Sequence, residues 1–212
     1  MSRHGDILTL TETAIEPTGH VCAFFNSADE EFGVLIPFIM DGVNHGDKLW
    51  YIVDPARRAE LLQRLQREDL NTDALQDSGQ LELYPWEEAH LLGGSFNKEA
   101  VLSRLDETLT SHEKQGYPLT RMWSNQEWAL KDVPGVAEIV EYESRFNYVA
   151  ERHAGLIVCV YDLSQFGANI VMDMLRTHPL VLIGGILREN PFYTPPDQFL
   201  RELSQRTNEA SA

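Results

Sequence analysis

The sequence predicts an α/β protein, a doubly wound domain in which helices cover both faces of a largely parallel sheet. Short apolar runs alternate along the chain with amphipathic segments of about 10–18 residues, and this alternation is typical of βαβ units. No stretch rich in glycine, serine or proline divides the 212 residues, and no internal repeat is evident. We therefore expect a single core that spans nearly the whole chain.

Six apolar runs mark the expected strands, and helical periodicity or capping residues mark the segments between them. The strands are expected over residues 20–25, 48–54, 80–86, 119–124, 156–162 and 180–187. The helices are expected from residue 29, over residues 56–69, 97–115, 134–152 and 165–176, and from residue 194. These elements form one domain at residues 18–207, between an N-terminal arm or short edge strand at residues 1–17 and a tail at residues 208–212.

The charge of the chain argues against several classes of partner. A formal net charge of −16 at pH 7 makes contact with nucleic-acid phosphates or an anionic membrane surface unfavourable. The two cysteines, Cys22 and Cys159, both lie in apolar strand-like runs and do not suggest a disulfide framework. No apolar run is long enough to cross a membrane, and the N-terminus lacks the pattern of a signal peptide. We therefore expect a cytoplasmic protein that binds neither nucleic acid nor membrane.

The first strand ends in a turn where open α/β proteins usually bind ligands. A phosphate-binding loop needs closely spaced glycines, a lysine and a serine or threonine. The turn here is Asn26-Ser27-Ala28-Asp29, and carboxylates follow it. No nucleophile elbow, HExxH zinc motif or CxxC pair occurs elsewhere in the chain. The sequence therefore predicts a ligand-binding protein rather than a common hydrolase, oxidoreductase or zinc enzyme.

Two pairs of residues whose side chains can bind a metal or react with oxidants lie on expected strands. His20 and Cys22 are two apart and share one face of their strand, as do Cys159 and Tyr161. If these strands are neighbours, the imidazole and both thiols can form a metal or haem site, or the thiols can sense oxidants. The competing interpretation is that both cysteines are small buried apolar residues.

Glu127 follows the fourth strand, at the position of the catalytic carboxylate of nucleotide hydrolases. Because Trp123 and Trp128 flank it, one interpretation is a raised pKa and a role in binding a polar ligand group; the other is an exposed loop carboxylate beside two core tryptophans. The same strand carries Arg121, and a charge in a buried strand needs a partner. The candidates for that partner are Glu127, Glu141 and Glu143.

The helix expected over residues 134–152 carries Glu141-Tyr142-Glu143 and Arg145. The spacing of Glu141 and Arg145 favours a surface ion pair, so we expect this face of the helix to be solvated.

The order and spacing of several short motifs resemble the MEDS family, the methanogen/methylotroph DcmR sensory domain, over about residues 18–203. These motifs are His20-x-Cys22, Trp123-x-x-x-Glu127 with Ala129-Leu130, Glu141-Tyr-Glu143, Cys159-x-Tyr161-Asp162, Thr177-His178-Pro179 and Glu189-Asn-Pro-Phe-Tyr193. The resemblance implies a RecA/KaiC-like fold that lacks the phosphate-binding loop. It also implies a prokaryotic signalling domain, of a kind found beside histidine kinases, DNA-binding domains or anti-sigma-factor modules and proposed to sense small hydrocarbon derivatives.

The leading hypothesis is a non-enzymatic, stand-alone sensor that binds a small organic ligand and signals to a separate regulatory protein, such as a histidine kinase or an anti-sigma-factor module. It needs no cofactor and no metal, and a homodimer is an open alternative. The expected ligand-binding residues are His20, Cys22, Phe24, Trp123, Glu127, Cys159, Tyr161 and His178. Three alternatives stay open: a degenerate nucleotide-binding protein of the RecA/KaiC type, a pure interaction module, and a metal or haem redox sensor through His20, Cys22 and Cys159.

Overall fold

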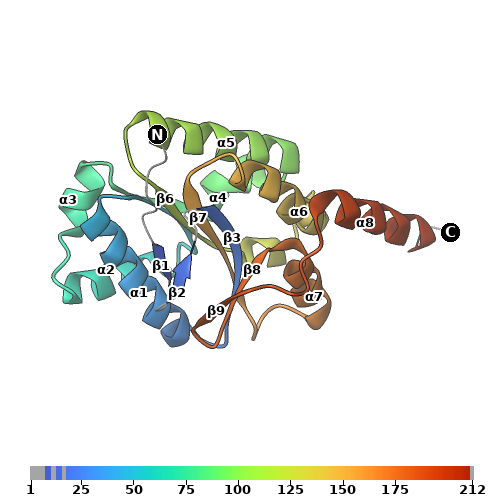
Figure 1. Cartoon of the computed structure of the whole chain (residues 1–212), viewed down its shortest axis with the longest axis horizontal. Coiled ribbons are helices and arrows are strands. Elements are labelled where there is room, and N and C mark those ends of the chain that lie inside the picture. The colour runs from blue at the N-terminus through green and yellow to red at the C-terminus, as the bar shows by residue number, and fades with distance from the viewer. Residues whose placement is uncertain (1–7, 11–12, 16–17, 211–212) are drawn as a thin grey trace.

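A central sheet of seven strands organises the computed structural model, which describes residues 8–10, 13–15 and 18–210 (Figure 1). The order of the strands across the sheet is β5-β4-β6-β7-β3-β8-β9, and every neighbouring pair is parallel except β8 with β9. The strands are β3 (Thr18–Phe25), β4 (Lys48–Val53), β5 (Leu81–Pro85), β6 (Thr120–Asn125), β7 (Gly155–Asp162), β8 (Leu180–Ile183) and β9 (Ile186–Glu189). A separate antiparallel pair precedes them, formed by β1 (Leu8–Leu10) and β2 (Thr13–Ile15).

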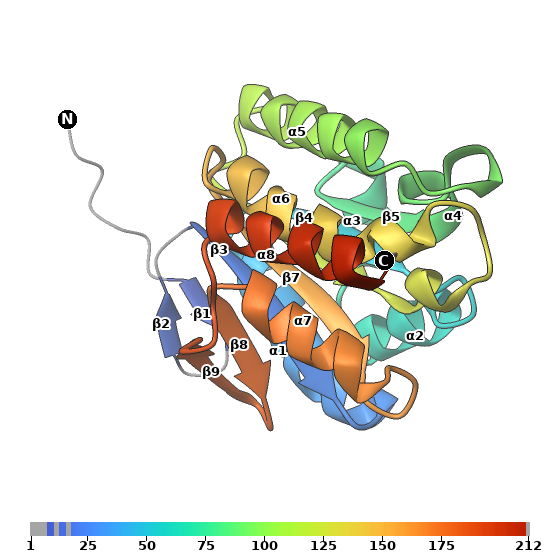
Figure 2. The same cartoon turned by 90° about the vertical axis from the view of Figure 1, so that its right-hand side faces the viewer.

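Helices cover both faces of the sheet, as predicted for a doubly wound domain. On one face lie α1 (Ala28–His45), α2 (Arg58–Arg67) and α3 (Thr72–Asp77). On the other lie α5 (Lys98–Lys114), α6 (Ile139–Ala150), α7 (Ala168–Thr177) and α8 (Pro196–Ala210), which face the viewer in Figure 2. Short helical segments complete the chain, namely α4 (Trp86–Ala89), η1 (Leu92–Gly94), η2 (Glu127–Leu130) and η3 (Val136–Glu138).

Two hydrophobic cores result from the period-two alternation of side chains along the central strands. In β3, Cys22 and Phe24 enter the core beneath α5, α6 and α7, whereas Val21 and Ala23 enter the core beneath α1 and α2. Because β3 and β7 pair in parallel with Cys22 opposite Cys159, both strands send equivalent residues to the same face. The register therefore decides which polar side chains meet.

The last predicted strand, over residues 180–187, is wrong as a single element. The structure has the hairpin β8–β9, which turns at Gly184 and Gly185 with φ angles of 57° and 72°. A two-residue hairpin turn of this kind needs positive φ at both central residues, which glycine adopts without strain. The pair of adjacent glycines is the signal that the apolar run obscured.

The structure also describes elements at both ends of the chain. The expected tail begins at residue 208, but α8 continues through Ala210, and residues 211–212 lie outside the described residues. Within the predicted N-terminal arm, β1 pairs with β2 in antiparallel orientation, and the remaining residues up to 17 are not described. Across the described part of the chain, none of the helices combines the length and apolar character needed to span a membrane.

Candidate functional site

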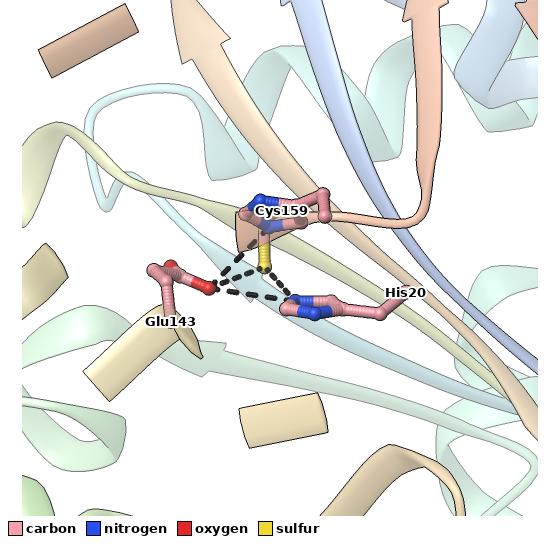
Figure 3. Close-up of side chains that lie close together, drawn as sticks. His20, Glu143 and Cys159 are labelled. Atoms are coloured by element: carbon pink, nitrogen blue, oxygen red, sulfur yellow. Dashed lines mark hydrogen bonds and ion pairs between the residues drawn. The ribbon is translucent and has the colours of Figure 1, made fainter. Parts of the chain in front are cut away.

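Four metal-ligating side chains from four segments converge between the sheet and the helices α6 and α7. We call His20, Glu143, Cys159 and His178 the buried cluster; their donor atoms all lie within 4.8 Å of one another. His20 comes from β3, Cys159 from β7, Glu143 from α6 and His178 from the C-cap of α7. Figure 3 shows His20, Glu143 and Cys159 directed toward one another. None of the four side chains is more than 1% exposed.

The distances within the buried cluster are short and similar. The carboxylate oxygen Oε2 of Glu143 lies 3.4 Å from Nε2 of His20, 3.5 Å from Nε2 of His178 and 3.5 Å from Sγ of Cys159. The Cys159 sulfur is also 3.4 Å from Nε2 of His20. The other two donor pairs, which join His178 to His20 and to Cys159, lie within 4.8 Å.

A second layer of hydrogen bonds orients the buried cluster. Nδ1 of His20 lies 3.2 Å from Oδ1 of Asn147, and Nδ1 of His178 lies 2.8 Å from the carbonyl oxygen of Met174. The Tyr161 hydroxyl lies 3.0 Å from Oε1 of Glu143, to which it donates. Each ring is thus held by its Nδ1 atom, and its Nε2 atom faces the carboxylate.

Burial sets the protonation of the buried cluster. Desolvation lowers the pKa of His20 to about 4; the neighbouring His178 also lowers it, whereas Glu143 and Asn147 raise it. Burial opposes ionisation of Glu143, yet hydrogen bonds and charge from the two imidazoles hold the pKa of that carboxyl well below its usual range. Desolvation raises the pKa of the Cys159 thiol, and the Glu143 carboxylate raises it further.

A separate hollow of about 260 Å³ opens at the carboxyl ends of β3, β4, β6 and β7, and we call it the edge hollow. In open α/β folds this edge of the sheet is where ligands bind. Its lining includes five carboxylates and one arginine. The lining residues are Phe25, Ser27, Ala28, Glu31, Asp54, Arg57, Glu60, Glu127, Val160, Asp162 and Gln165.

Glu127 is the unpartnered carboxylate of the edge hollow. Its side chain is 6% exposed, and neither of its carboxylate oxygens has a hydrogen-bond partner. Burial raises the pKa of Glu127 to about 7, and the negative charge of Glu31 adds to that rise. Of the two interpretations of Glu127, burial favours the raised pKa over the exposed loop carboxylate. The group is therefore poised to gain or lose a proton, or to meet a ligand, near neutral pH.

The other polar groups around the edge hollow are already paired. Glu31 accepts hydrogen bonds from Nε1 of Trp123 at 3.1 Å and from Nδ2 of Asn125 at 3.0 Å, and it forms a 2.7 Å ion pair with Arg57. At the first turn of α1, Glu30 accepts the backbone N–H of Asn26 at 2.8 Å. A carboxylate of the chain itself thus occupies an N–H group that a phosphate-binding loop would offer to its ligand.

The residues predicted to bind a ligand are divided between these two places. His20, Cys159 and His178 belong to the buried cluster, and Tyr161 contacts it through Glu143. Cys22 and Phe24 are nearby on the same face; the Cys22 thiol lies 3.6 Å from the carbonyl oxygen of Leu180, to which it donates, and is not one of the four donors.

Two of the predicted ligand-binding residues lie away from the buried cluster. Trp123 faces the core beneath α1, and Glu127 lines the edge hollow. The eight residues expected around a single pocket therefore do not meet at one place in the structure.

Sequence reasoning missed Glu143 and Asn147. Glu143 was assigned to a solvated helix face, but it is fully buried, whereas the predicted surface pair of Glu141 with Arg145 is present at 2.7 Å. The available signal was their spacing: Glu143 and Asn147 fall four and eight residues after the buried Ile139. Polar residues within an apolar helical stripe need internal partners.

The raised pKa of Glu127 predicts that stability depends on pH. An unfolded glutamate titrates near 4.3, so the folded chain binds this proton more tightly, and its stabilising effect is complete below about pH 4. We expect about 2–3 kcal/mol of unfolding free energy to be lost as pH rises from about 4 to about 7. Urea unfolding at pH 5 and pH 8 should show this loss in the wild type, and Glu127→Gln should remove it. Glu87→Gln, at an exposed position, should leave it unchanged; a loss of equal size in Glu127→Gln would contradict the assignment.

Comparison with known proteins agrees with the class that this architecture defines, an α/β domain built on a KaiC-like sheet. The KaiC-like protein PH0186 of Pyrococcus horikoshii OT3 superimposes with a TM-score of 0.57 at 13% identity, over 81% of this chain and 73% of the other. The family model of the MEthanogen/methylotroph, DcmR Sensory domain (MEDS) matches residues 19–179. The chain belongs to this family, and it is a sensory domain with a role in signalling.

A curated relative supports the same conclusion. The transcriptional repressor DcmR of Methylorubrum extorquens (strain DSM 6343 / CIP 106787 / DM4) is 24% identical to this chain over 160 residues, which are 75% of this chain. The match spans 57% of the length of the repressor. The predicted fold and family are thus both confirmed.

Proposed function

We propose that this sensory domain binds a small organic molecule in the edge hollow and passes its bound state to a regulatory protein, without catalysing a reaction. The observation that carries the proposal is Glu127, a residue whose carboxylate is buried and unpartnered and which belongs to the lining of a hollow at the carboxyl edge of the sheet. A desolvated group without a partner costs free energy in the empty protein. A ligand that donates a hydrogen bond to this group removes that cost, which makes its binding free energy more favourable.

The charge of the edge hollow narrows the class of ligand. Five carboxylates face one guanidinium, that of Arg57, which is already paired with Glu31. A neutral or cationic molecule suits this lining. The carboxylates repel a phosphate-bearing nucleotide, and the turn after β3 lacks the glycine-rich loop that would bind its phosphates. Small methylated compounds that carry an N–H or O–H group meet the requirements of size, charge and hydrogen bonding, and methylated compounds belong to the class proposed for this family.

The segment after β6 is the element suited to transmit binding. It contains η2, begins next to Asn125 and carries both Glu127, in the edge hollow, and Trp128, in the hydrophobic core. A ligand that changes the position or protonation of Glu127 shifts the balance between arrangements of this segment. The surface formed by this segment is the proposed contact for a regulatory protein, such as a histidine kinase or an anti-sigma-factor module.

Replacing Glu127 with glutamine is expected to weaken ligand binding without unfolding the protein. The probes are methylammonium chloride and methanol, each tested as a concentration series for the shift in thermal unfolding temperature that binding produces. At least one should stabilise the wild type and the control Glu87→Gln, with a smaller shift in Glu127→Gln. Equal shifts in all three proteins would move the binding site away from the edge hollow. If ATP stabilises the protein only when magnesium is present, this result would favour the nucleotide-binding alternative instead.

A further inference from the structure

The hydrogen bonds around the buried cluster fix the tautomers of its two histidines. The amide nitrogen of Asn147 donates to the carbonyl oxygens of Ser144 at 3.0 Å and Thr177 at 2.8 Å, so its oxygen faces His20. The proton of neutral His20 is therefore on Nδ1, where it is donated to Asn147. His178 follows the same rule, because its Nδ1 faces the carbonyl oxygen of Met174, which only accepts.

Lone pairs of the buried cluster consequently face one another. When both rings are neutral, their Nε2 atoms present a lone pair to Oε2 of Glu143, at 3.4 and 3.5 Å, and Nε2 of His178 has no hydrogen-bond partner. The Cys159 thiol has a single hydrogen to share between Oε2 of Glu143 and Nε2 of His20. A proton added to one imidazole satisfies one contact and leaves the other Nε2 facing the carboxylate. A metal cation at the centre satisfies all four donors together.

We propose that His20, Glu143, Cys159 and His178 bind one divalent transition metal ion, with zinc the ion that the donors fit best. Zinc–ligand bonds of about 2.0–2.3 Å in a tetrahedron place donor atoms about 3.3–3.7 Å apart. The four pairs described above lie 3.4, 3.4, 3.5 and 3.5 Å apart. Imidazole and thiolate donors select zinc or a similar transition ion over magnesium or calcium.

The charge and the surroundings of the buried cluster agree with this proposal. Cys159 loses its thiol proton on binding, so a thiolate and the Glu143 carboxylate together neutralise a divalent ion inside the protein. The bonds from Nδ1 of both histidines, and from the Tyr161 hydroxyl to Glu143, are the outer contacts that orient ligands at metal sites. All four coordination positions come from the protein at full burial, as in closed structural sites.

This site departs from the sequence-based hypotheses in its ligands. The leading hypothesis has no metal, and the metal or haem alternative uses Cys22. In the structure the Cys22 thiol faces the backbone of β8, and Glu143 and His178 complete the set of donors. The ion would join α6 and the end of α7 to the central strands β3 and β7. The proposal is independent of ligand binding in the edge hollow, because it uses none of the residues that line that hollow.

Metal analysis of the purified protein tests the proposal, and Cys22 supplies a matched control. The protein is refolded from denaturant with zinc and passed over a desalting column, and its zinc content is measured by inductively coupled plasma mass spectrometry. About one zinc per chain is expected in the wild type and in Cys22→Ala, and at least about tenfold less in Cys159→Ala and His178→Ala. Equal zinc in all four proteins, or none in the wild type, would overturn the proposal.

Cobalt provides a second measurement that does not need the cluster variants to fold. Cys22→Ala retains Cys159 as its one thiol, since the chain has two cysteines. After refolding with Co²⁺, this variant should show a sulfur-to-cobalt charge-transfer band in the near ultraviolet and visible bands typical of tetrahedral cobalt. The absence of the charge-transfer band in refolded Cys22→Ala would rule out Cys159 as a ligand and overturn the proposal.

Discussion

Replacing Arg121 with methionine is expected to lower the free energy of unfolding by about 3–5 kcal/mol, because one partner of a buried ion pair is then left without the other. Arg121 is 1% exposed; its Nε lies 2.7 Å from Asp47, and its Nη2 lies 2.7 Å from Asp41. It also donates to the carbonyl oxygen of Phe38 at 3.1 Å. Methionine keeps most of the side-chain volume, so the loss reports on charge rather than on a cavity.

The pH dependence of the stability lost in Arg121→Met further separates the effect of the missing charge from that of a cavity. Burial already raises the pKa of Asp47, and the hydrogen bond from Arg121 lowers it in part. Without Arg121 the pKa of folded Asp47 rises more, so its stabilising protonation is lost as pH increases. Urea unfolding should therefore show a smaller deficit at pH 5 than at pH 8.

A surface arginine serves as the control for Arg121. Arg64 forms ion pairs with Asp29 and Glu60, but its side chain is 30% exposed. Arg64→Met should cost less than about 1 kcal/mol, because water screens an exposed pair. Equal losses in the two variants would show that burial of Arg121 does not govern its contribution.

Replacing Gly135 with alanine is expected to destabilise the domain by about 2–5 kcal/mol, from left-handed backbone strain of about 1–2 kcal/mol and a forced displacement of about 1–3 kcal/mol. Gly135 has a φ of 86°, and a Cβ atom there would lie 2.0 Å from the carbonyl oxygen of Phe96. The two segments are already joined by a 2.9 Å hydrogen bond from the N–H of Phe96 to Pro134, so neither can move freely.

Gly116 isolates the steric part of this effect. Its φ of 89° is nearly the same, but a Cβ atom there would meet no heavy atom within 4 Å. Gly116→Ala should therefore cost only the backbone strain, about 1–2 kcal/mol. Chemical unfolding of both variants measures the difference, and equal costs would mean that the Phe96 segment shifts without penalty.

Local pattern was sufficient for most of the fold. The alternation of apolar runs and amphipathic segments predicts the parallel sheet with helices on both faces, and each of the first five strands lies close to its predicted range. The hairpin β8–β9 was missed because an apolar run of eight residues has the same composition whether or not it turns back at Gly184–Gly185. Only the φ angles of those glycines distinguish the two structures.

The partner of Arg121 shows what local pattern omits. The sequence correctly predicts that this buried charge needs an internal ion pair, and it names three glutamates as candidates. The observed partners are Asp41 and Asp47 at the end of α1 and just beyond it. The choice among carboxylates depends on which helix packs on which face of β6, and that is settled by the packing of the whole sheet.

The sequence by itself determined the class of this protein: a KaiC-like α/β domain of the MEDS family, without a phosphate-binding loop, in which His20 shares a strand face with Cys22 and Cys159 with Tyr161. Strand periodicity and turn chemistry are local, so they can be read from neighbouring residues. Only the tertiary structure decided that Glu143 and His178 join His20 and Cys159 while Glu127 and Trp123 lie elsewhere. Such contacts depend on strand order, on parallel register and on the face that each helix buries, and these are properties of the whole chain.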